Sequence, residues 1–273
     1  MTMFDFNRIT QETDLYNLHT HTQFCDGHSP MEDFVVEAIA QGFTHLGFTP
    51  HSPISVDSPV NMSRDQVQAY FDEIDRLRSA YGDRIHLYTS MEIDYVGAGD
   101  GPASDYFQQL PLDYRIGSVH FIPSINDSAD MVDIDGKFAG FKARMGEKFN
   151  GDIEYVVNRF FAQMMAMVDE GGFDIVGHMD KIGFNASQYR ANIDEEPWFD
   201  KLVIDLFENI MDHHLTIEIN TKAWLQRNRF YPNLKYFGMV KRFNAPVVVN
   251  SDAHYPTLIN SGRLEAIKLL NVL

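Results

Sequence analysis

The alternation of strand-like and helix-like segments constrains the fold of this chain more than any other feature. Short apolar, β-branched runs alternate seven times with segments that carry apolar residues at helical spacing. No Gly/Ser-rich linker, internal repeat or change of composition divides the 273 residues. Strands separated by helices pair in parallel, so the pattern predicts an α/β barrel, with residues 1–273 in a single domain. The expected strands are residues 15–21, 44–49, 84–91, 115–119, 173–177, 215–219 and 246–250.

Between the fourth and fifth expected strands, residues 121–151 form a long polar stretch without clear periodicity. Loops of this length in a compact domain are usually lids or binding loops. We therefore expect this segment to lie at a functional site. The expected helices include residues 30–41, 63–81, 152–170, 197–213, 234–243 and 262–270.

Histidine and acidic residues recur at the C-terminal ends of the expected strands. His19 and His21 sit at alternate positions of the first strand, so their rings project to the same side. In an α/β barrel these strand ends share one face, which carries the active site. The predicted metal ligands are His19, His21, His28, His51, Glu92, His120, His178, Asp252 and His254.

This set contains seven of the eleven histidines. Nine nitrogen and oxygen ligands exceed the needs of one tetrahedral zinc and suit two or three divalent ions, with a carboxylate such as Glu92 or Asp252 as a bridge. Taken alone, His-Thr-His is equally well explained as a polar strand end. The other four histidines fall inside elements or near a helix end, and we expect them to be structural: His45, His86, His213 and His214.

Composition narrows the class of protein further. Hydrophobic residues make up 44% of the chain, enough for a large core. A formal charge of −17 without any run of Lys and Arg argues against nucleic-acid binding. The sequence has no apolar run near the ~18 residues of a membrane span, no signal-like start, and a single cysteine, Cys25. We expect a cytoplasmic protein with neither a nucleic-acid nor a membrane partner.

Seven segments of the chain, in order, resemble the polymerase and histidinol phosphatase family of metal hydrolases, and within it the histidinol-phosphate phosphatase branch. Between them they span most of the chain. Pro50 departs from the pattern, because many members carry an Asp there that orients the following histidine. The segments are HTHTQFCDGHS (19–29), the His51 loop, MEIDY (91–95), GSVHF (117–121), DIVGHMD (174–180), EINT (218–221) and SDAH (251–254).

The resemblance implies a distorted (β/α)7 barrel with a trinuclear site, and a division of the ligands among three ions. Zinc would be the first choice of metal, with iron, manganese or cobalt as alternatives, because imidazole and carboxylate ligands bind all four. The implied sets are His19, His21, Glu92 and Asp252 for the first ion, His28, His51 and His254 for the second, and Glu92, His120 and His178 for the third.

The implied activity is hydrolysis of L-histidinol phosphate to L-histidinol and phosphate, in histidine biosynthesis. Clustered dications suit this chemistry, because they activate water, neutralise phosphoryl oxygens and stabilise the leaving alkoxide. Asp252 is a candidate to accept the proton of the attacking water. The family pattern places an arginine near the phosphate, for which Arg159 is the first choice, and Lys222, just after a strand end, is the second.

Two other readings remain open at this point. The family also includes phosphoesterases that act on other small phosphates or nucleotides, and a nuclease branch that the acidic composition disfavours. A non-catalytic metal-binding protein would explain the histidines but not their spread over so many strand ends.

Overall fold

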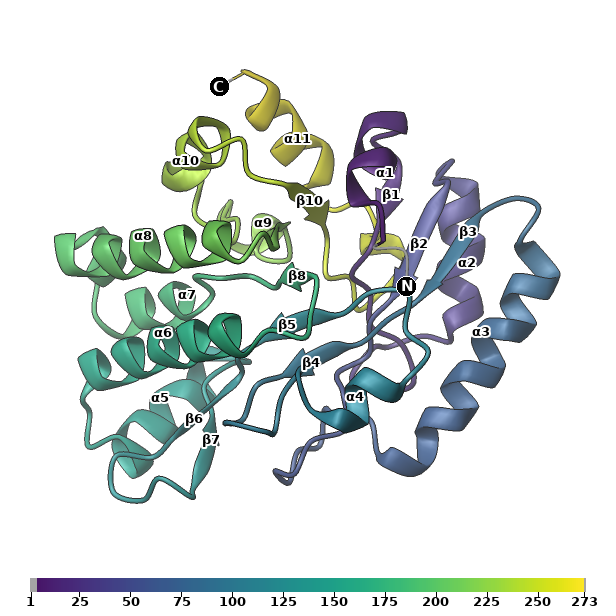
Figure 1. Ribbon diagram of the computed structural model, residues 1–273. Coiled ribbons are helices and arrows are strands. Elements are labelled where there is room, and N and C mark those ends of the chain that lie inside the picture. The colour runs from purple at the N-terminus through teal and green to yellow at the C-terminus, as the bar shows by residue number, and fades with distance from the viewer. Residues whose placement is uncertain (1–3, 273) are drawn as a thin grey trace.

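In the computed structural model, which describes residues 4–272, short parallel strands lie at the centre of the molecule and helices surround them (Figure 1). The parallel strands are β1 (Tyr16–Asn17), β2 (His45–Phe48), β3 (His86–Thr89), β4 (Glu92–Asp94), β5 (Ile116–Ser118), β8 (Ile175–Val176), β9 (Thr216–Asn220) and β10 (Val247–Asn250). The α-helices are α1 (Phe6–Glu12), α2 (Met31–Ala40), α3 (Val67–Tyr81), α4 (Asp105–Gln109), α5 (Phe138–Lys148), α6 (Ile153–Glu170), α7 (Ile182–Tyr189), α8 (Pro197–Asp212), α9 (Trp224–Arg227), α10 (Phe237–Arg242) and α11 (Arg263–Val272). Short 3₁₀ turns cover Arg64–Gln66, Ile193–Glu195, Leu234–Tyr236 and Pro256–Leu258.

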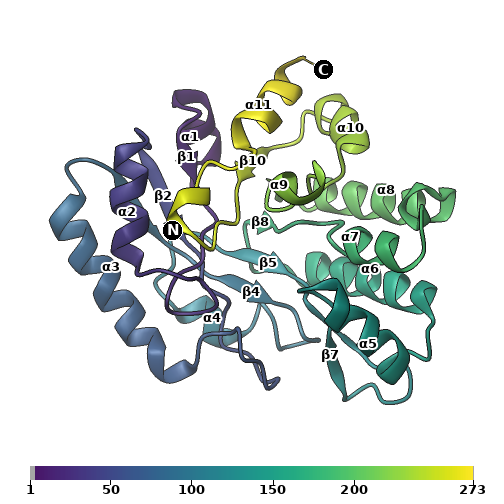
Figure 2. The same cartoon turned by 180° about the vertical axis from the view of Figure 1, so that it is seen from behind.

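Helices cover the strands from several sides because parallel strands need crossover connections. Figures 1 and 2 show α2 and α3 on one side of the molecule and α6, α7 and α8 on the other. α1 and α11 come from opposite ends of the sequence, yet both pack against β10. The last helix thus lies beside the start of the chain.

The strands belong to two parallel sheets, in the orders β1-β2-β3 and β10-β9-β8-β5-β4. Only two residues separate β3 from β4, so they act as two parts of one strand. Single parallel bridges also join the two sheets. One pairs Thr20, after the edge strand β1, with Ala253, after the edge strand β10, and the other pairs His51, after β2, with Glu92 of β4. The α/β class predicted from the sequence is confirmed. The ring of seven strand positions is distorted, because between β10 and β1 a single bridge takes the place of a regular ladder.

Residues 121–151 are more ordered than the sequence suggested. They contain an antiparallel hairpin, β6 (Phe121–Pro123) with β7 (Met131–Asp133), followed by α5. The hairpin escaped the sequence pattern because its strands, of three residues each, are too short to show a period. Two other boundaries also differ: Glu92 opens β4 instead of following β3, and the expected helix 234–243 is a 3₁₀ turn followed by α10.

One end of the ring is closed by apolar packing. Side chains of β1, β5, β8 and β10 meet α1 in a cluster that includes Leu18, Tyr114 and Ile175. The Tyr114 hydroxyl donates to the Leu18 carbonyl at 2.6 Å, and a Cβ at Gly47 would collide with that hydroxyl. The opposite end, at the carboxyl ends of the strands, is therefore where polar side chains can gather.

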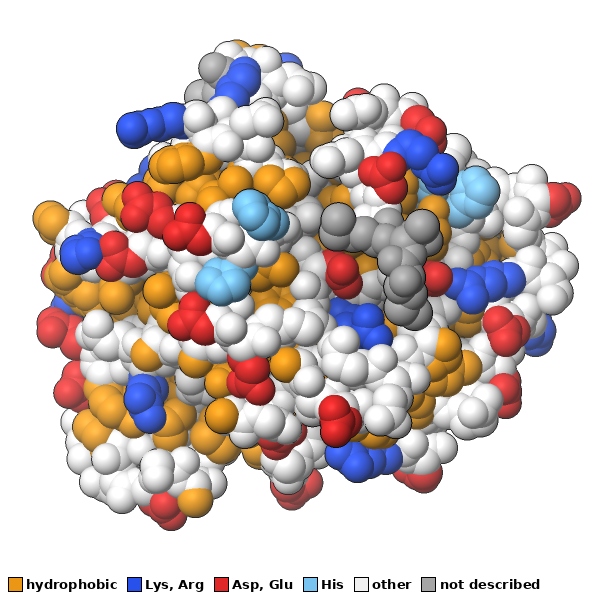
Figure 3. Space-filling view, in the orientation of Figure 1, with side chains coloured by type: hydrophobic (Ala, Val, Ile, Leu, Met, Phe, Trp, Pro, Cys, Tyr) orange, Lys and Arg blue, Asp and Glu red, His pale blue; other side chains and the backbone are white. Residues whose placement is uncertain are grey.

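Among residues 4–272, no helix combines the length and apolar character needed to cross a membrane. On the face seen in Figure 3, Lys and Arg side chains stand mostly singly among Asp and Glu.

Candidate metal centre

Most of the predicted ligands meet where the parallel strands end. His19 and His21 follow β1, and their Nε2 atoms lie 3.1 Å apart because alternate positions turn both rings the same way. Three groups of side chains in the described residues have ligand atoms within 4.8 Å of one another. They are His19, His21 and Asp252; His21, Asp26, His51 and His254; and His51, Glu92 and His120.

Glu92 lies at the centre of this cluster. Its Oε2 atom is 3.3 Å from Nε2 of both His19 and His21, and 3.2 Å from Nδ1 of His51. Its Oε1 atom is 2.7 Å from Nε2 of His178. A buried carboxylate within reach of four imidazoles is well placed to bridge two ions.

Asp252 approaches from the loop after β10. Its Oδ1 atom lies 3.2 Å from His21 Nε2, while Asn220 donates to its Oδ2 atom at 3.1 Å. Asp252 has a φ of 50° and His178 a φ of 24°, in a region that non-glycine residues seldom occupy. Such conformations concentrate at functional sites, where the surrounding structure enforces them.

Asp26 joins the cluster and was not among the predicted ligands. Its Oδ1 atom lies 3.2 Å from His254 Nε2 and 3.7 Å from both His51 Nε2 and His21 Nδ1. The signal in the sequence was an acidic residue in a Cys-Asp-Gly turn directly after the His-x-His pair.

His28 does not reach the cluster. Its ring is exposed and stacks on Tyr255, with 4.4 Å between the ring centroids. The cause is a tight turn in which the amides of Cys25 and Gly27 both donate to the Thr22 carbonyl. This turn directs the side chain at position 26 inward and leaves His28 outside.

Two further carboxylates orient the histidines. His19 Nδ1 lies 2.6 Å from Glu218 Oε1, and His120 Nδ1 lies 2.6 Å from Asp94 Oδ1. A hydrogen bond at Nδ1 fixes the ring and leaves Nε2 for an ion. Asp94 was not predicted, although it stands two residues beyond Glu92 on the same strand, where strand alternation turns both side chains to one side.

Several buried polar atoms in the cluster have no hydrogen-bond partner: Oδ1 of Asp26, Nδ1 of His51, Oε2 of Glu92 and Nδ1 of His178. Leaving such an atom unpaired costs about 1–3 kcal/mol. His51 Nδ1 has no hydrogen-bond partner, and position 50 carries Pro instead of the Asp that would orient this ring. Imidazole nitrogens and carboxylate oxygens are ligands for zinc, iron and manganese, so the donor set fits divalent ions.

The electrostatics also suit metal binding. Burial lowers the pKa of His51 to about 3 and that of His254 to about 4, so both rings are neutral ligands at neutral pH. Burial also lowers the pKa of His19, but Glu218 and Glu92 outweigh it and raise the pKa to about 10. The carboxylates thus favour positive charge at this histidine, and an ion can supply that charge in place of a proton.

A family model described as the PHP domain matches residues 17–222. The chain belongs to the PHP domain family. The matched region includes the ligand candidates from His19 to His178, whereas Asp252 and His254 lie beyond its end.

Several relatives of this PHP-family chain match it over most of its length. A Deinococcus radiodurans protein, provisionally named a histidinol-phosphatase, is 24% identical over 262 residues, covering 94% of this chain and 92% of the relative. The crystal structure of a Listeria monocytogenes protein, also provisionally named a histidinol phosphatase, has a TM-score of 0.80 at 18% identity. The match covers 92% of this chain and 99% of the Listeria chain. The structure of Lactococcus lactis histidinol phosphate phosphatase, complexed with zinc, L-histidinol and phosphate, has a TM-score of 0.69 at 19% identity and covers 94% of this chain and 92% of its own. The two structures share the fold of this chain.

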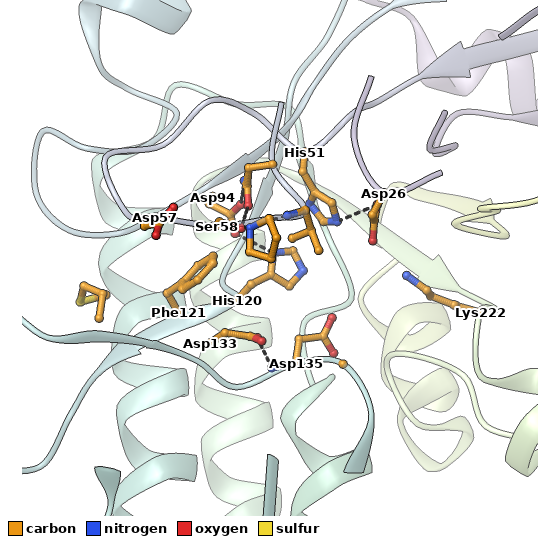
Figure 4. Close-up of a pocket in the computed structure, with 15 residues that line it drawn as sticks. Asp26, His51, Asp57, Ser58, Asp94, His120, Phe121, Asp133, Asp135 and Lys222 are labelled. Atoms are coloured by element: carbon orange, nitrogen blue, oxygen red, sulfur yellow. Dashed lines mark hydrogen bonds and ion pairs between the residues drawn. The ribbon is translucent and has the colours of Figure 1, made fainter. Parts of the chain in front are cut away.

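Two pockets open from the centre of this PHP domain, and Lys222 lines both. One, of about 220 Å³, reaches the loop 57–61 and the β6–β7 hairpin, and the other, of about 440 Å³, reaches α7 and α9. The Lys222 Nζ atom lies 3.2 Å from both Asp252 Oδ1 and His254 Nε2, and Figure 4 shows this side chain beside Asp26. A second lysine, Lys181, also lies at the cluster, with its Nζ atom 3.4 Å from His120 Nε2. It was not among the predicted site residues.

Arg159 lies apart from these groups. Its side chain is exposed on α6, where it lines a separate pocket with Tyr95, Gly97 and Ser128. None of the metal-ligand candidates lines that pocket. The structure therefore brings Lys222 to the cluster and leaves Arg159 outside it, because α6 packs on the outside of the strand ring.

Proposed function

We propose that this PHP-family chain is a metal-dependent phosphomonoester hydrolase that converts L-histidinol phosphate to L-histidinol and phosphate. The observation that carries the proposal is the convergence of His, Asp and Glu side chains, several with unpaired buried atoms, at the mouths of two pockets that share Lys222. The relative solved with zinc, L-histidinol and phosphate supports the choice of substrate.

The proposed cofactor is two to three divalent ions, with zinc as the first choice. The geometry supports Asp26 in place of His28 in the second ligand set. The proposed sets are His19, His21, Glu92 and Asp252; Asp26, His51 and His254; and Glu92, His120 and His178. Bound ions would lower the pKa of water, neutralise the phosphoryl oxygens and stabilise the leaving alkoxide.

The protein's own groups would complete the chemistry. Asp252 is held ionised, because Lys222 and His19 outweigh the effect of burial and keep its pKa well below the usual range. It is therefore available as a metal ligand at neutral pH, and it remains the proposed acceptor of the proton of the attacking water. With Asp252 and His254 occupied as metal ligands, the ammonium of Lys222 would be left to donate hydrogen bonds to the phosphate.

The proposed function predicts the outcome of a substrate panel. Metal-replete protein should release phosphate from L-histidinol phosphate with a higher kcat/KM than from nucleoside monophosphates, sugar phosphates or phosphotyrosine. A clear preference for one of the other esters would support the hydrolase activity but contradict L-histidinol phosphate as its substrate. No phosphate release from any ester, with metal bound, would favour a non-catalytic metal-binding protein.

Lys222 is expected to matter more than Arg159. Charged hydrogen bonds are about twice as strong as neutral ones, so Lys222→Ala should lower kcat/KM by roughly tenfold or more. Arg159→Ala should stay within about threefold of the parent, because the arginine is exposed and remote from the cluster. Metal content, measured in parallel, should be the same in both variants. The reverse ranking would return the phosphate-binding role to Arg159.

A further inference from the structure

The two pockets beside the metal centre differ in charge. The larger is lined by four cationic and two acidic side chains, whereas the smaller is lined by five acidic side chains, with Lys222 at one wall; Asp26 and Asp135 line both pockets. The cations of the larger pocket are Lys137, Lys181, Lys222 and Arg227. The acids of the smaller pocket are Asp26, Asp57, Asp94, Asp133 and Asp135.

The smaller pocket leads away from the metal-ligand candidates. Figure 4 shows Lys222 and Asp26 at one end of it, Asp57 and Phe121 toward the other, and His120 between them. The buried His51, whose Nδ1 atom has no hydrogen-bond partner, also lines it. A phosphate held at the metal centre can therefore direct its alcohol group along this pocket toward Asp57.

The acids of the smaller pocket are not equally available to a ligand. Asp94 receives hydrogen bonds on both oxygens, from His120 and Asn61, and Asp135 pairs with Lys181 at 2.7 Å. Both groups are thus already engaged within the protein.

The two acids farther out differ. Asp133 also has a partner on each oxygen but stays partly exposed, whereas Asp57 is free of protein partners among the described residues. Asp133 accepts the Asp135 amide at 2.7 Å and faces Arg144 at 3.2 Å, with its side chain 43% exposed. Asp57 is exposed and has no hydrogen-bond or ion-pair partner within residues 4–272. Its full charge remains for a ligand, while Phe121 and Met131 offer apolar contact for the ligand's carbon atoms.

We propose that Asp57, assisted by Asp133, selects phosphomonoesters whose alcohol carries a positive charge. This inference rests on the proposed hydrolase function. An ammonium or imidazolium that leaves water for this pocket is stabilised by the carboxylates, whereas a neutral alcohol is not and an anionic one is repelled. The larger pocket, with four cations and two acids, lacks this excess of negative charge.

Phosphoethanolamine and propyl phosphate test the charge selection, because they are similar in size and differ in charge. The measured quantity is the ratio of their kcat/KM values, alongside kcat/KM for L-histidinol phosphate. We expect the parent to favour phosphoethanolamine, Asp57→Asn to lower the ratio by about tenfold, and Asp57→Asn with Asp133→Asn to lower it further. The control is Asp83→Asn, which makes the same change in net charge at an exposed position before β3, at the opposite end of the strands.

The outcomes separate this inference from the proposed function. If L-histidinol phosphate is hydrolysed but Asp57→Asn leaves the ratio within twofold, the inference is overturned and the function stands. If L-histidinol phosphate is not a substrate but the ratio still falls only in the Asp57 variants, the inference stands and the proposed substrate fails. A parent that prefers propyl phosphate contradicts the charge selection outright.

Discussion

Glu92→Ala is expected to lose bound metal and phosphatase activity together, with kcat/KM reduced by about a thousandfold or more. Glu92 is within 3.3 Å of His19, His21 and His51 and within 2.7 Å of His178, so no other side chain in the cluster can replace its bridging position. Removing a single charge-stabilising donor from an active site already costs about 10²–10³ in rate, and this carboxylate serves more than one ion.

Elemental analysis of protein purified without chelators, with kinetics on the same samples, checks this result. His213→Ala is the matched control, because that ring is exposed at the end of α8 and its Nδ1 atom bonds the Asn209 carbonyl, away from the cluster. It should keep both metal and activity. A Glu92→Ala protein that is fully active without metal would remove the basis of the proposed function.

Asp26→Ala is expected to remove about one ion per chain and to lower kcat/KM by roughly a hundredfold, whereas His28→Ala should remain within about threefold of the parent. The reason is geometric. Asp26 lies 3.2 Å from His254 and 3.7 Å from His51, while His28 stacks on Tyr255 outside the cluster.

This pair of variants separates the ligand set implied by family resemblance from the set supported by the structure. Metal content read by elemental analysis, before and after dialysis against excess zinc, shows whether the second ion is lost or only weakened. Loss of an ion in His28→Ala, with normal content in Asp26→Ala, would mean that metal binding rearranges the turn 22–27.

The sequence by itself determined the fold class and the neighbourhood of the site. The carboxyl ends of parallel strands share one end of the ring, so polar residues at successive strand ends meet without any knowledge of side-chain geometry. His19, His120 and Asp252 come together for this reason. The alternation of side chains along a strand was enough to place His19 and His21 on one side.

Only the tertiary structure decided which residues complete the cluster. Hydrogen bonds within the turn after His21 choose Asp26 over His28, and such a turn is not readable from residue spacing. Glu218 lies on β9, nearly two hundred residues beyond His19 in the sequence. Only the folded arrangement of the strands brings its carboxylate to 2.6 Å from the His19 ring. The same holds for Lys222 and Arg159, since a cation's role depends on whether its element faces the ring or the solvent. Sequence periodicity defines the faces of each element, whereas the packing of elements against one another decides what each face meets.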